Sequence, residues 1–191
     1  AYAMLFVLVG SEMCIRDRII ACYKAGVAKF DGKKFTLYDD GLDDKRVILL
    51  ENGFDGEIWA GTESAGIGVL EQDQFKMIRD SDGLAHNEMF SLYNDGKRMW
   101  AGTFGGGVSC FHDNTWFTLR ESDGLNSNTV GSIVSIDENT TMIGGTSGVS
   151  IFKTNNQKFS LEMGDILTPK EELSFDKQME PIKGILKDRF T

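Results

Sequence analysis

The sequence predicts an all-β fold, a β-propeller fragment of about four consecutive four-stranded antiparallel blades that is not closed. Residues 59–62 (Trp-Ala-Gly-Thr) return 41 residues later as 100–103 and, degraded, after another 42 as 142–145. The tripeptide Asp-Gly-Leu keeps the same interval at 40–42, 82–84 and 123–125. Two motifs in phase indicate an array of one supersecondary unit, and a period of about 40 residues is typical of propeller blades.

The best-defined unit reads as four short strands. Strand 89–94 ends at an Asp-Gly hairpin signal, strand 99–103 returns, a Gly-Gly-Gly turn leads to strand 108–111, and strand 116–120 follows. The neighbouring units repeat this order at 47–52, 58–62, 68–71 and 75–79, and at 130–137, 141–144, 148–152 and 158–161. Because consecutive strands of a meander alternate in direction, we expect the loop after the second strand and the Asp-Gly-Leu loop to open on one face, and the Asp-Gly hairpins on the other.

Residues 1–18 fall outside the repeat. The pattern is legible from Ile19, which takes the place of Trp100. The apolar run at 4–9 suggests a signal peptide or a lipoprotein anchor at Cys14. However, no basic residue precedes the run, it is too short to span a membrane, and Met13 stands where a lipoprotein signal has a small residue. The segment closely resembles a recurrent spurious translation of sequencing-adapter DNA, so we interpret it as foreign to the native protein.

The remaining chain divides into repeats 19–57, 58–98, 99–140 and a truncated 141–191. Residues 182–188 match 130–137 as another first strand, after a polar loop that contains Pro169. The chain stops at Thr191, where the next Trp-x-Gly-Thr strand is due. We therefore expect a fragment of a longer protein with an exposed edge strand at each end, and expect the rest of the parent chain to close the propeller.

Eight repeat residues are expected to be structural. The Trp rings fill the wedge between blades, and Gly in the strand lets the neighbouring blade approach. They are Trp59, Gly61, Trp100, Gly102 and Gly144 in the strand motif, and Gly41, Gly83 and Gly124 in the turn motif.

Composition excludes several function classes. The chain has 20 Lys plus Arg against 29 Asp plus Glu, a net charge of −9, and no concentrated basic patch. Such a surface repels phosphate backbones, so we expect no nucleic acid partner. The three cysteines show no pair spacing, and we expect no disulfide framework, no metal site and no cofactor.

The Trp-x-Gly-Thr strand, the Gly-Gly-Val turn, the aromatic fourth strand and the Asp-Gly-Leu lead-in together resemble the two-component regulator propeller repeat. The resemblance covers residues 19–191, with departures at 19–22, 142–143 and 180–181. In that family such repeats form a periplasmic sensor of hybrid histidine kinases or of related membrane signalling proteins. The resemblance implies a non-catalytic, extracytoplasmic sensor, commonly of glycan breakdown products, whose kinase and phosphorelay lie outside this sequence.

The sequence carries no catalytic constellation. His86 follows an Asp-Gly-Leu motif, whereas His112 ends a third strand on the opposite face, so we expect that the two do not share a site. No Ser-His-Asp order and no Gly-x-Ser-x-Gly motif occurs. Asp55 and Asp95 are similar to the Asp-box hairpins of sialidase-like propellers but lack the Ser two residues earlier, so we interpret them as hairpin turns.

We predict a ligand-binding face where the residues after each Asp-Gly-Leu lead into the innermost strands, at the mouth of the central channel. The alternative for each residue is a solvated loop position or a cap. Phe104 on the same face is placed to stack on a sugar ring. The candidates are Asp43, Asp44, Lys45, Arg46, His86, Asn87, Glu88, Phe104, Asn126, Ser127 and Asn128.

Three functions follow, in decreasing order of support. The first is a sensor of a small-molecule or oligosaccharide ligand, and a homodimer of the longer parent protein is compatible with this function. The second is a protein-interaction scaffold, and the third is a propeller hydrolase or lyase, for which Asp82 and His86 are the residues to substitute.

Overall fold

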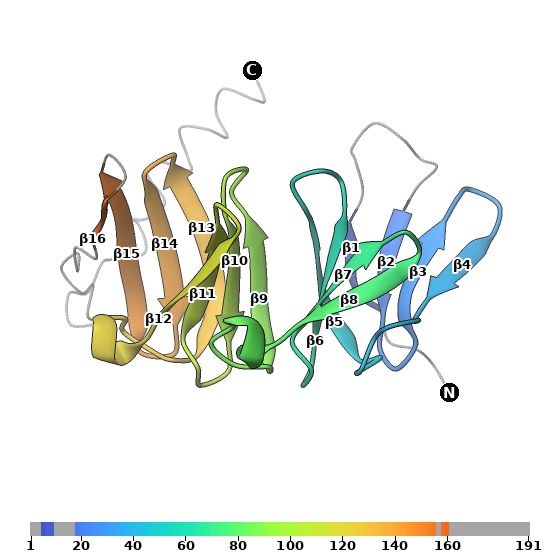
Figure 1. Ribbon diagram of the computed structural model, residues 1–191, viewed down its shortest axis with the longest axis horizontal. Helices are drawn as coiled ribbons and strands as arrows, with labels where there is room; N and C mark the ends of the chain where they lie inside the picture. Colours follow the sequence, from blue (N-terminus) through green and yellow to red (C-terminus); the bar gives the residue numbers. More distant parts are fainter. Residues whose placement is uncertain (1–4, 10–17, 156–157, 161–191) are drawn as a thin grey trace, which may run out of the picture.

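The computed structural model describes residues 5–9, 18–155 and 158–160, which form an all-β structure. This described part contains four four-stranded sheets, each an antiparallel meander whose strands lie in chain order. Figure 1 shows the sheets side by side, with the first and last at opposite ends of the row. The prediction of an unclosed propeller fragment of about four blades is confirmed.

The strands of sheets 2, 3 and 4 follow the predicted order. Sheet 1 contains β1 (Leu5–Val9), β2 (Arg18–Cys22), β3 (Gly26–Phe30) and β4 (Phe35–Tyr38). Sheet 2 contains β5 (Val47–Asn52), β6 (Ile58–Thr62), β7 (Ile67–Glu71) and β8 (Gln74–Ile78). Sheet 3 contains β9 (Met89–Asn94), β10 (Met99–Thr103), β11 (Val108–His112) and β12 (Thr115–Leu119). Sheet 4 contains β13 (Val130–Asp137), β14 (Thr140–Gly145), β15 (Gly148–Asn155) and β16 (Lys158–Ser160).

Strand β1 lies in the segment that the repeat pattern excluded. It pairs antiparallel with β2, with Val9 opposite Ile19, and it also contacts β5 of sheet 2. Its short apolar run therefore takes the place of a first strand. The interpretation of residues 1–18 as foreign concerns their origin and stays a prediction. The predicted strand 182–188 lies outside the described residues.

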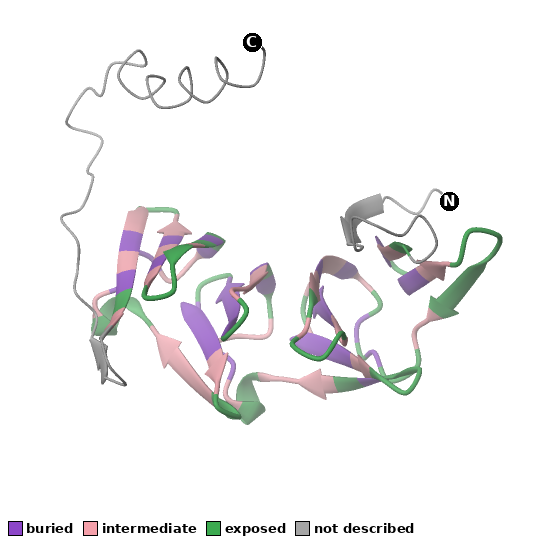
Figure 2. Cartoon of the chain, turned by 90° about the horizontal axis from the view of Figure 1, so that it is seen from above, coloured by how far each residue is buried: buried purple, intermediate pink, exposed green. Residues whose placement is uncertain are grey.

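The core divides among the junctions between neighbouring sheets. The first strands β1, β5, β9 and β13 contact one another in turn, so the sheets radiate from a shared inner edge. One buried cluster joins sheets 1 and 2, a second joins sheets 2 and 3, and a third joins sheets 3 and 4. Figure 2 shows the buried positions along the strands and the exposed ones mainly in the loops. At each junction, one face of a sheet packs on the opposite face of the next.

The strand-motif tryptophans pack across these junctions. The Trp100 ring is fully buried, with its centroid 5.1 Å from that of Phe152 in sheet 4. The Trp59 ring lies 5.9 Å from Phe111 and 6.1 Å from Trp116, both in sheet 3. The wedge between two sheets is thus filled by a ring from one sheet against aromatic residues of the next.

Gly102 shows why glycine accompanies the tryptophan. A Cβ atom at this position would lie 2.5 Å from the carbonyl oxygen of Val130, in the first strand of the next sheet. The absence of a side chain therefore lets β13 approach β10 closely.

The Asp-Gly-Leu motif shapes the linker from each sheet to the next. Asp82 Oδ2 accepts a hydrogen bond from the Arg79 amide at 2.9 Å and closes a 3₁₀ turn, η1 (Asp80–Asp82). Gly83 then takes a left-handed conformation, φ 116°, which favours glycine. Leu84, which is buried, plugs the junction between sheets 2 and 3. Residues 121–125 repeat this arrangement, with η2 (Glu121–Asp123) as the turn.

Candidate functional site

The predicted loops do meet on one face. The amide of Gly66, in the β6–β7 loop, donates to the carbonyl of Asn87 at 2.8 Å, and that of Gly107 donates to Asn128 at 2.7 Å. In sheet 1 the amide of Gly26 donates to Lys45 at 3.0 Å. Each bond joins a loop inside one sheet to the linker that enters the next. We call residues 39–48, 63–66, 80–90, 104–107, 121–131 and 146–147, which include the starts of the first strands, the loop face.

Equivalent candidates in the three linkers have one local role. Asp44 Oδ1 accepts the amide of Arg46 at 2.9 Å, His86 Nδ1 accepts that of Glu88 at 3.1 Å, and Ser127 Oγ accepts that of Thr129 at 3.1 Å. Each side chain therefore satisfies a backbone donor just before a first strand.

Asp44 is also the centre of a polar network. Arg46 donates to both of its carboxylate oxygens at 2.9 Å, and the Ser64 hydroxyl donates to Oδ2 at 2.8 Å. Arg46 also pairs with Glu63 at 2.5 Å. Burial opposes ionisation of Asp44, but the bonds from Arg46 and Ser64 outweigh it and hold the pKa of this carboxyl below its usual value.

The asparagines brace the linkers. Asn87 Oδ1 accepts the amide of Asp80 at 2.8 Å, and Asn128 Oδ1 accepts that of Glu121 at 2.9 Å. Asn126 Nδ2 donates to the carbonyl of Val149 at 2.6 Å and so ties the linker to β15.

Four further candidates differ in their surroundings. Asp43 pairs with Arg79, and Lys45 with Asp39 at 2.5 Å. Glu88 and Phe104 are exposed. Most of the polar candidates therefore hold the loops together, and their role toward a ligand stays a prediction.

Phe90 is a loop-face residue that the pattern did not single out. It follows Met89 at the start of β9 and is 49% exposed, and its ring centroid lies 6.0 Å from that of Phe104, which is 54% exposed. The first strands of sheets 2, 3 and 4 each carry an irregularity in register near their start, where Ile48, Phe90 and Gly131 are equivalent. Comparison of the three repeats position by position, with this irregularity in mind, would have drawn attention to Phe90.

A hollow of about 410 Å³ adjoins Phe90. Its lining consists of Phe90, Thr129, Gly131, Ser132, Gly144, Gly145, Thr146, Gly148 and Val149. The part around Gly144 is the position where a following sheet would pack. At the equivalent place in sheet 3, Gly102 is covered by Val130, whose carbonyl accepts a hydrogen bond from Ser91 Oγ at 3.1 Å. The part between Phe90, Gly131 and Thr129 belongs to the inner edge of the sheets.

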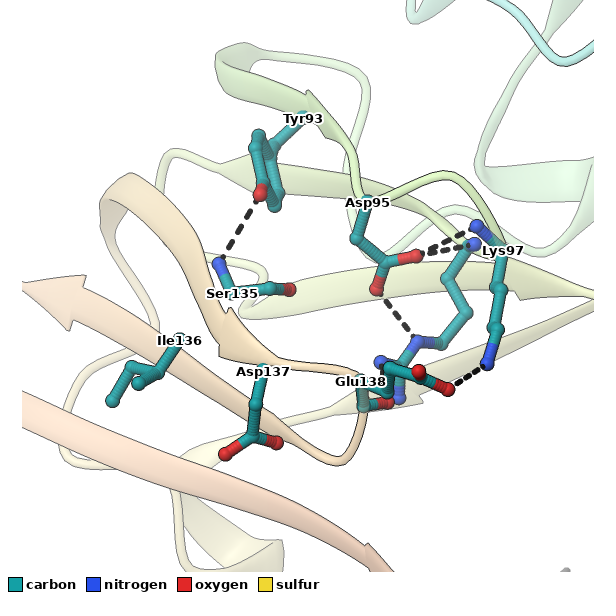
Figure 3. Close-up of a pocket in the computed structure, with 8 residues that line it drawn as sticks. Tyr93, Asp95, Lys97, Ser135, Ile136, Asp137 and Glu138 are labelled. Atoms are coloured by element: carbon teal, nitrogen blue, oxygen red, sulfur yellow. Dashed lines mark hydrogen bonds and ion pairs between the residues drawn. The ribbon is translucent and has the colours of Figure 1, made fainter.

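A second hollow, of about 260 Å³, lies on the opposite, hairpin face between sheets 3 and 4 (Figure 3). Asp95 accepts hydrogen bonds there from the Arg98 Nε at 2.7 Å and from the Trp100 indole at 3.0 Å. Glu138 pairs with Lys97 at 2.6 Å. The ion pairs Arg98–Asp95 and Lys97–Glu138 line this hollow, so its geometry indicates a structural contact that holds sheets 3 and 4 together.

The two histidines lie on different faces. His86 belongs to the loop face, whereas His112 Nδ1 lies 3.2 Å from the carbonyl of Lys97, in the hairpin after β9. No group of three or more His, Cys, Asp or Glu side chains in the described ranges has the arrangement of a metal site. None of the helices in those ranges has the length and apolar character that crossing a membrane requires.

Comparison with solved structures gives the same fold. The extracellular domain of BT3049 from B. thetaiotaomicron, described as a hybrid two component system, matches at a TM-score of 0.66 with 18% identity, over 84% of this chain and 24% of that one. That of BT4673 from the same organism, described as a one component system, matches at a TM-score of 0.66 with 12% identity, over 90% and 26%. The chain shares the fold of these extracellular domains.

An ancestral GH74 enzyme matches less well, at a TM-score of 0.59 with 17% identity, over 79% of this chain and 23% of that one. No protein-family model matches the sequence, and no curated protein matches it. The chain spans about a quarter of the length of the extracellular domains that it matches. The neighbours agree with the resemblance to the two-component regulator propeller repeat.

Proposed function

We propose that this chain is the ligand-sensing part of a periplasmic propeller whose parent relays binding to a histidine kinase. The observation that carries the proposal is the fold, four radiating sheets shared with the extracellular domains of two sensor systems. On the loop face, hydrogen bonds join a loop of each sheet to the linker that enters the next, so a ligand bound there would contact more than one sheet. Binding would then shift the sheets relative to one another, which is a physical basis for a signal.

Sequencing outward from both ends of the reading frame in the source DNA tests this proposal. We expect further repeats downstream, then a connector, a membrane span and a histidine kinase. Closure of the propeller within a few blades, with no span or kinase, would overturn the signalling role. Upstream, codons that differ from those of residues 1–18 would confirm that this segment is foreign.

A protein-interaction scaffold is the second candidate, because two exposed phenylalanines on the loop face also suit a protein partner. Capture of a folded partner with no response to small molecules would favour it.

The geometry gives less support to a hydrolase, despite the GH74 neighbour. Asp82 closes the η1 turn and His86 accepts the Glu88 amide, so both side chains already serve the linker. We expect that Asp82→Ala and His86→Ala change the stability of the chain, and that neither the unsubstituted chain nor these variants cleave a saccharide.

A further inference from the structure

We propose that Phe90 and Phe104 form an aromatic platform for an uncharged saccharide, in the space that Gly131 leaves open at the channel mouth. This inference rests on the proposed sensing function and names the site and the ligand class. It depends on the exposure of the two rings, on the room beside them and on the charge of the surroundings.

The exposure of the platform does not arise from the open ends of the row. Of the other exposed large apolar side chains, Phe35 and Leu37 in sheet 1 and Val134 and Ile136 in sheet 4 belong to the two end sheets, and Phe54 lies in the hairpin of sheet 2 on the opposite face. Phe90 and Phe104 belong to sheet 3, which has a neighbour on both sides. Closing the ring would cover the end sheets and leave the platform exposed, and a contiguous apolar patch that stays exposed is a candidate interaction site.

The room beside the platform comes from a departure in the repeat. Sheets 2 and 3 carry Ile48 and Phe90 at the channel-facing position, whereas sheet 4 carries Gly131. A Cβ atom at Gly131 would lie 3.3 and 3.4 Å from two carbons of the Phe90 ring, so this ring lies against the glycine. The φ angle of Gly131 is outside the left-handed region, so the backbone there accepts other residues. The glycine therefore makes room for the Phe90 ring and for the hollow beside it, rather than relieving strain.

The chemistry of the space suits a sugar ring. At the inner edge and on the loop face its lining carries the hydroxyls of Thr129 and Thr146 beside an aromatic ring, and no residue of the lining is charged. Ser132 is equivalent to Ser91 and belongs to the part where a following sheet would pack. On the loop face, Arg46 is committed to Asp44 and Glu63, and Lys45 to Asp39. With a net charge of −9, the chain repels anions. An apolar sugar face on an aromatic ring, with hydroxyls at its edge, matches these features, whereas an acidic saccharide finds no counter-charge.

Isothermal titration calorimetry on the 191-residue chain tests the inference with two probe sets. Neutral cello-, xylo-, malto- and arabino-oligosaccharides form one set, and oligogalacturonides form the acidic set. The variants are Phe90→Ala, Phe104→Ala and Gly131→Ile, the last of which installs the residue that sheet 2 carries. Phe54→Ala is the matched control, because Phe54 is 40% exposed in a hairpin on the opposite face. Thermal unfolding of each variant checks that it folds.

We expect a neutral oligosaccharide to bind the unsubstituted chain. Phe90→Ala and Phe104→Ala should each raise Kd at least about tenfold, and Gly131→Ile should abolish binding. Phe54→Ala should bind as the unsubstituted chain does. Binding that all three platform variants leave unchanged would overturn this site while leaving the proposed sensing function standing. Preference for oligogalacturonides would overturn the uncharged class. If the folded, unsubstituted chain binds neither set, the result would count against both this site and saccharide sensing. If a peptide or protein binds through the same rings instead, it would replace the saccharide as the ligand.

Discussion

Substitution of Asp95 by alanine is predicted to destabilise the chain strongly, because this carboxylate organises the junction between sheets 3 and 4. The Asp95 and Arg98 side chains are 3% and 5% exposed, and they form an ion pair at 2.7 Å. Asp95 also accepts the Trp100 indole at 3.0 Å and the amides of Lys97 and Arg98. Arg98 in turn donates to the Glu138 carbonyl in sheet 4 and lies over the Phe152 ring.

The cost follows from what the substitution leaves behind. Removing one partner of a buried ion pair costs about 3–5 kcal/mol, and a buried indole N–H without an acceptor costs about 1–3 kcal/mol, with overlap between the two. Arg98 keeps its bond to Glu138, so we expect a total loss of about 3–5 kcal/mol in the free energy of unfolding. For a chain of this size that corresponds to a fall in Tm of roughly 6–20 °C.

Urea unfolding followed by circular dichroism measures this loss. Asp55→Ala is the control, because Asp55 is exposed in the equivalent hairpin of sheet 2, and we expect a change within about 0.5 kcal/mol. Adding Arg98→Met to Asp95→Ala should recover part of the stability, because the unpaired guanidinium is then gone. A loss below about 1 kcal/mol for Asp95→Ala, or no recovery in the double variant, would refute the reasoning.

Four further outcomes are expected. Trp100→Phe should cost about 1–3 kcal/mol more than Trp59→Phe in urea unfolding, because the Trp100 indole donates to Asp95 whereas the buried Trp59 indole nitrogen has no hydrogen-bond partner among the described residues. Equal costs would contradict this. Gly102→Ala should destabilise by about 1–3 kcal/mol more than Gly144→Ala, because a Cβ at Gly102 meets the Val130 backbone whereas one at Gly144 meets mainly the Ser132 hydroxyl, and similar losses would argue against the junction packing. Burial raises the pKa of the Cys110 thiol strongly, so mass spectrometry should find it unalkylated by iodoacetamide in the native chain and alkylated in guanidinium. Burial opposes ionisation of Asp95, but hydrogen bonds from Trp100 and from backbone amides hold its pKa below the usual value. The stability that this carboxylate contributes is therefore present above the unfolded pKa of about 3.9 and is lost as the pH falls through the folded value. Unfolding measured between pH 6 and pH 2 should show this loss, and Asp95→Asn should reduce it.

The sheets could be predicted from the sequence because the two motifs recur in phase and each has one physical task. Trp100 fills a junction, Gly102 admits the next strand, and Leu84 plugs the linker, so their spacing carries the architecture. Strand β1 was missed because an isolated apolar run has no repeat partner to identify it.

The two Asp-Gly hairpins looked alike in the sequence and are not. Asn94 pairs with Met99 across four residues, whereas Asn52 pairs with Ile58 across five. Gly53 therefore takes the structural position of Asp95, and the Trp59 indole loses its acceptor. The length of the hairpin loop decides whether an Asp lies within reach of the tryptophan indole, and a search for the Asp-Gly motif does not take that length into account.

The candidate site could be predicted only as a face. Polar loop residues were the natural candidates, but Asp44, Asn87 and Ser127 are bound within the linkers because buried backbone donors must be satisfied. Phe90 escaped notice because a phenylalanine in a strand suggests core, and the irregularity at the start of β9 is visible only in three dimensions.

Amide chemical-shift mapping by two-dimensional NMR tests most directly whether the loop face is the sensing surface. The chain labelled with ¹⁵N would be titrated with the neutral oligosaccharides. The account predicts shifts that gather at Phe90, Phe104 and Gly131, with smaller ones in the braced linkers. Shifts confined to the hairpin face around Asp95 and Glu138, or no shifts for a chain that is folded, would contradict it.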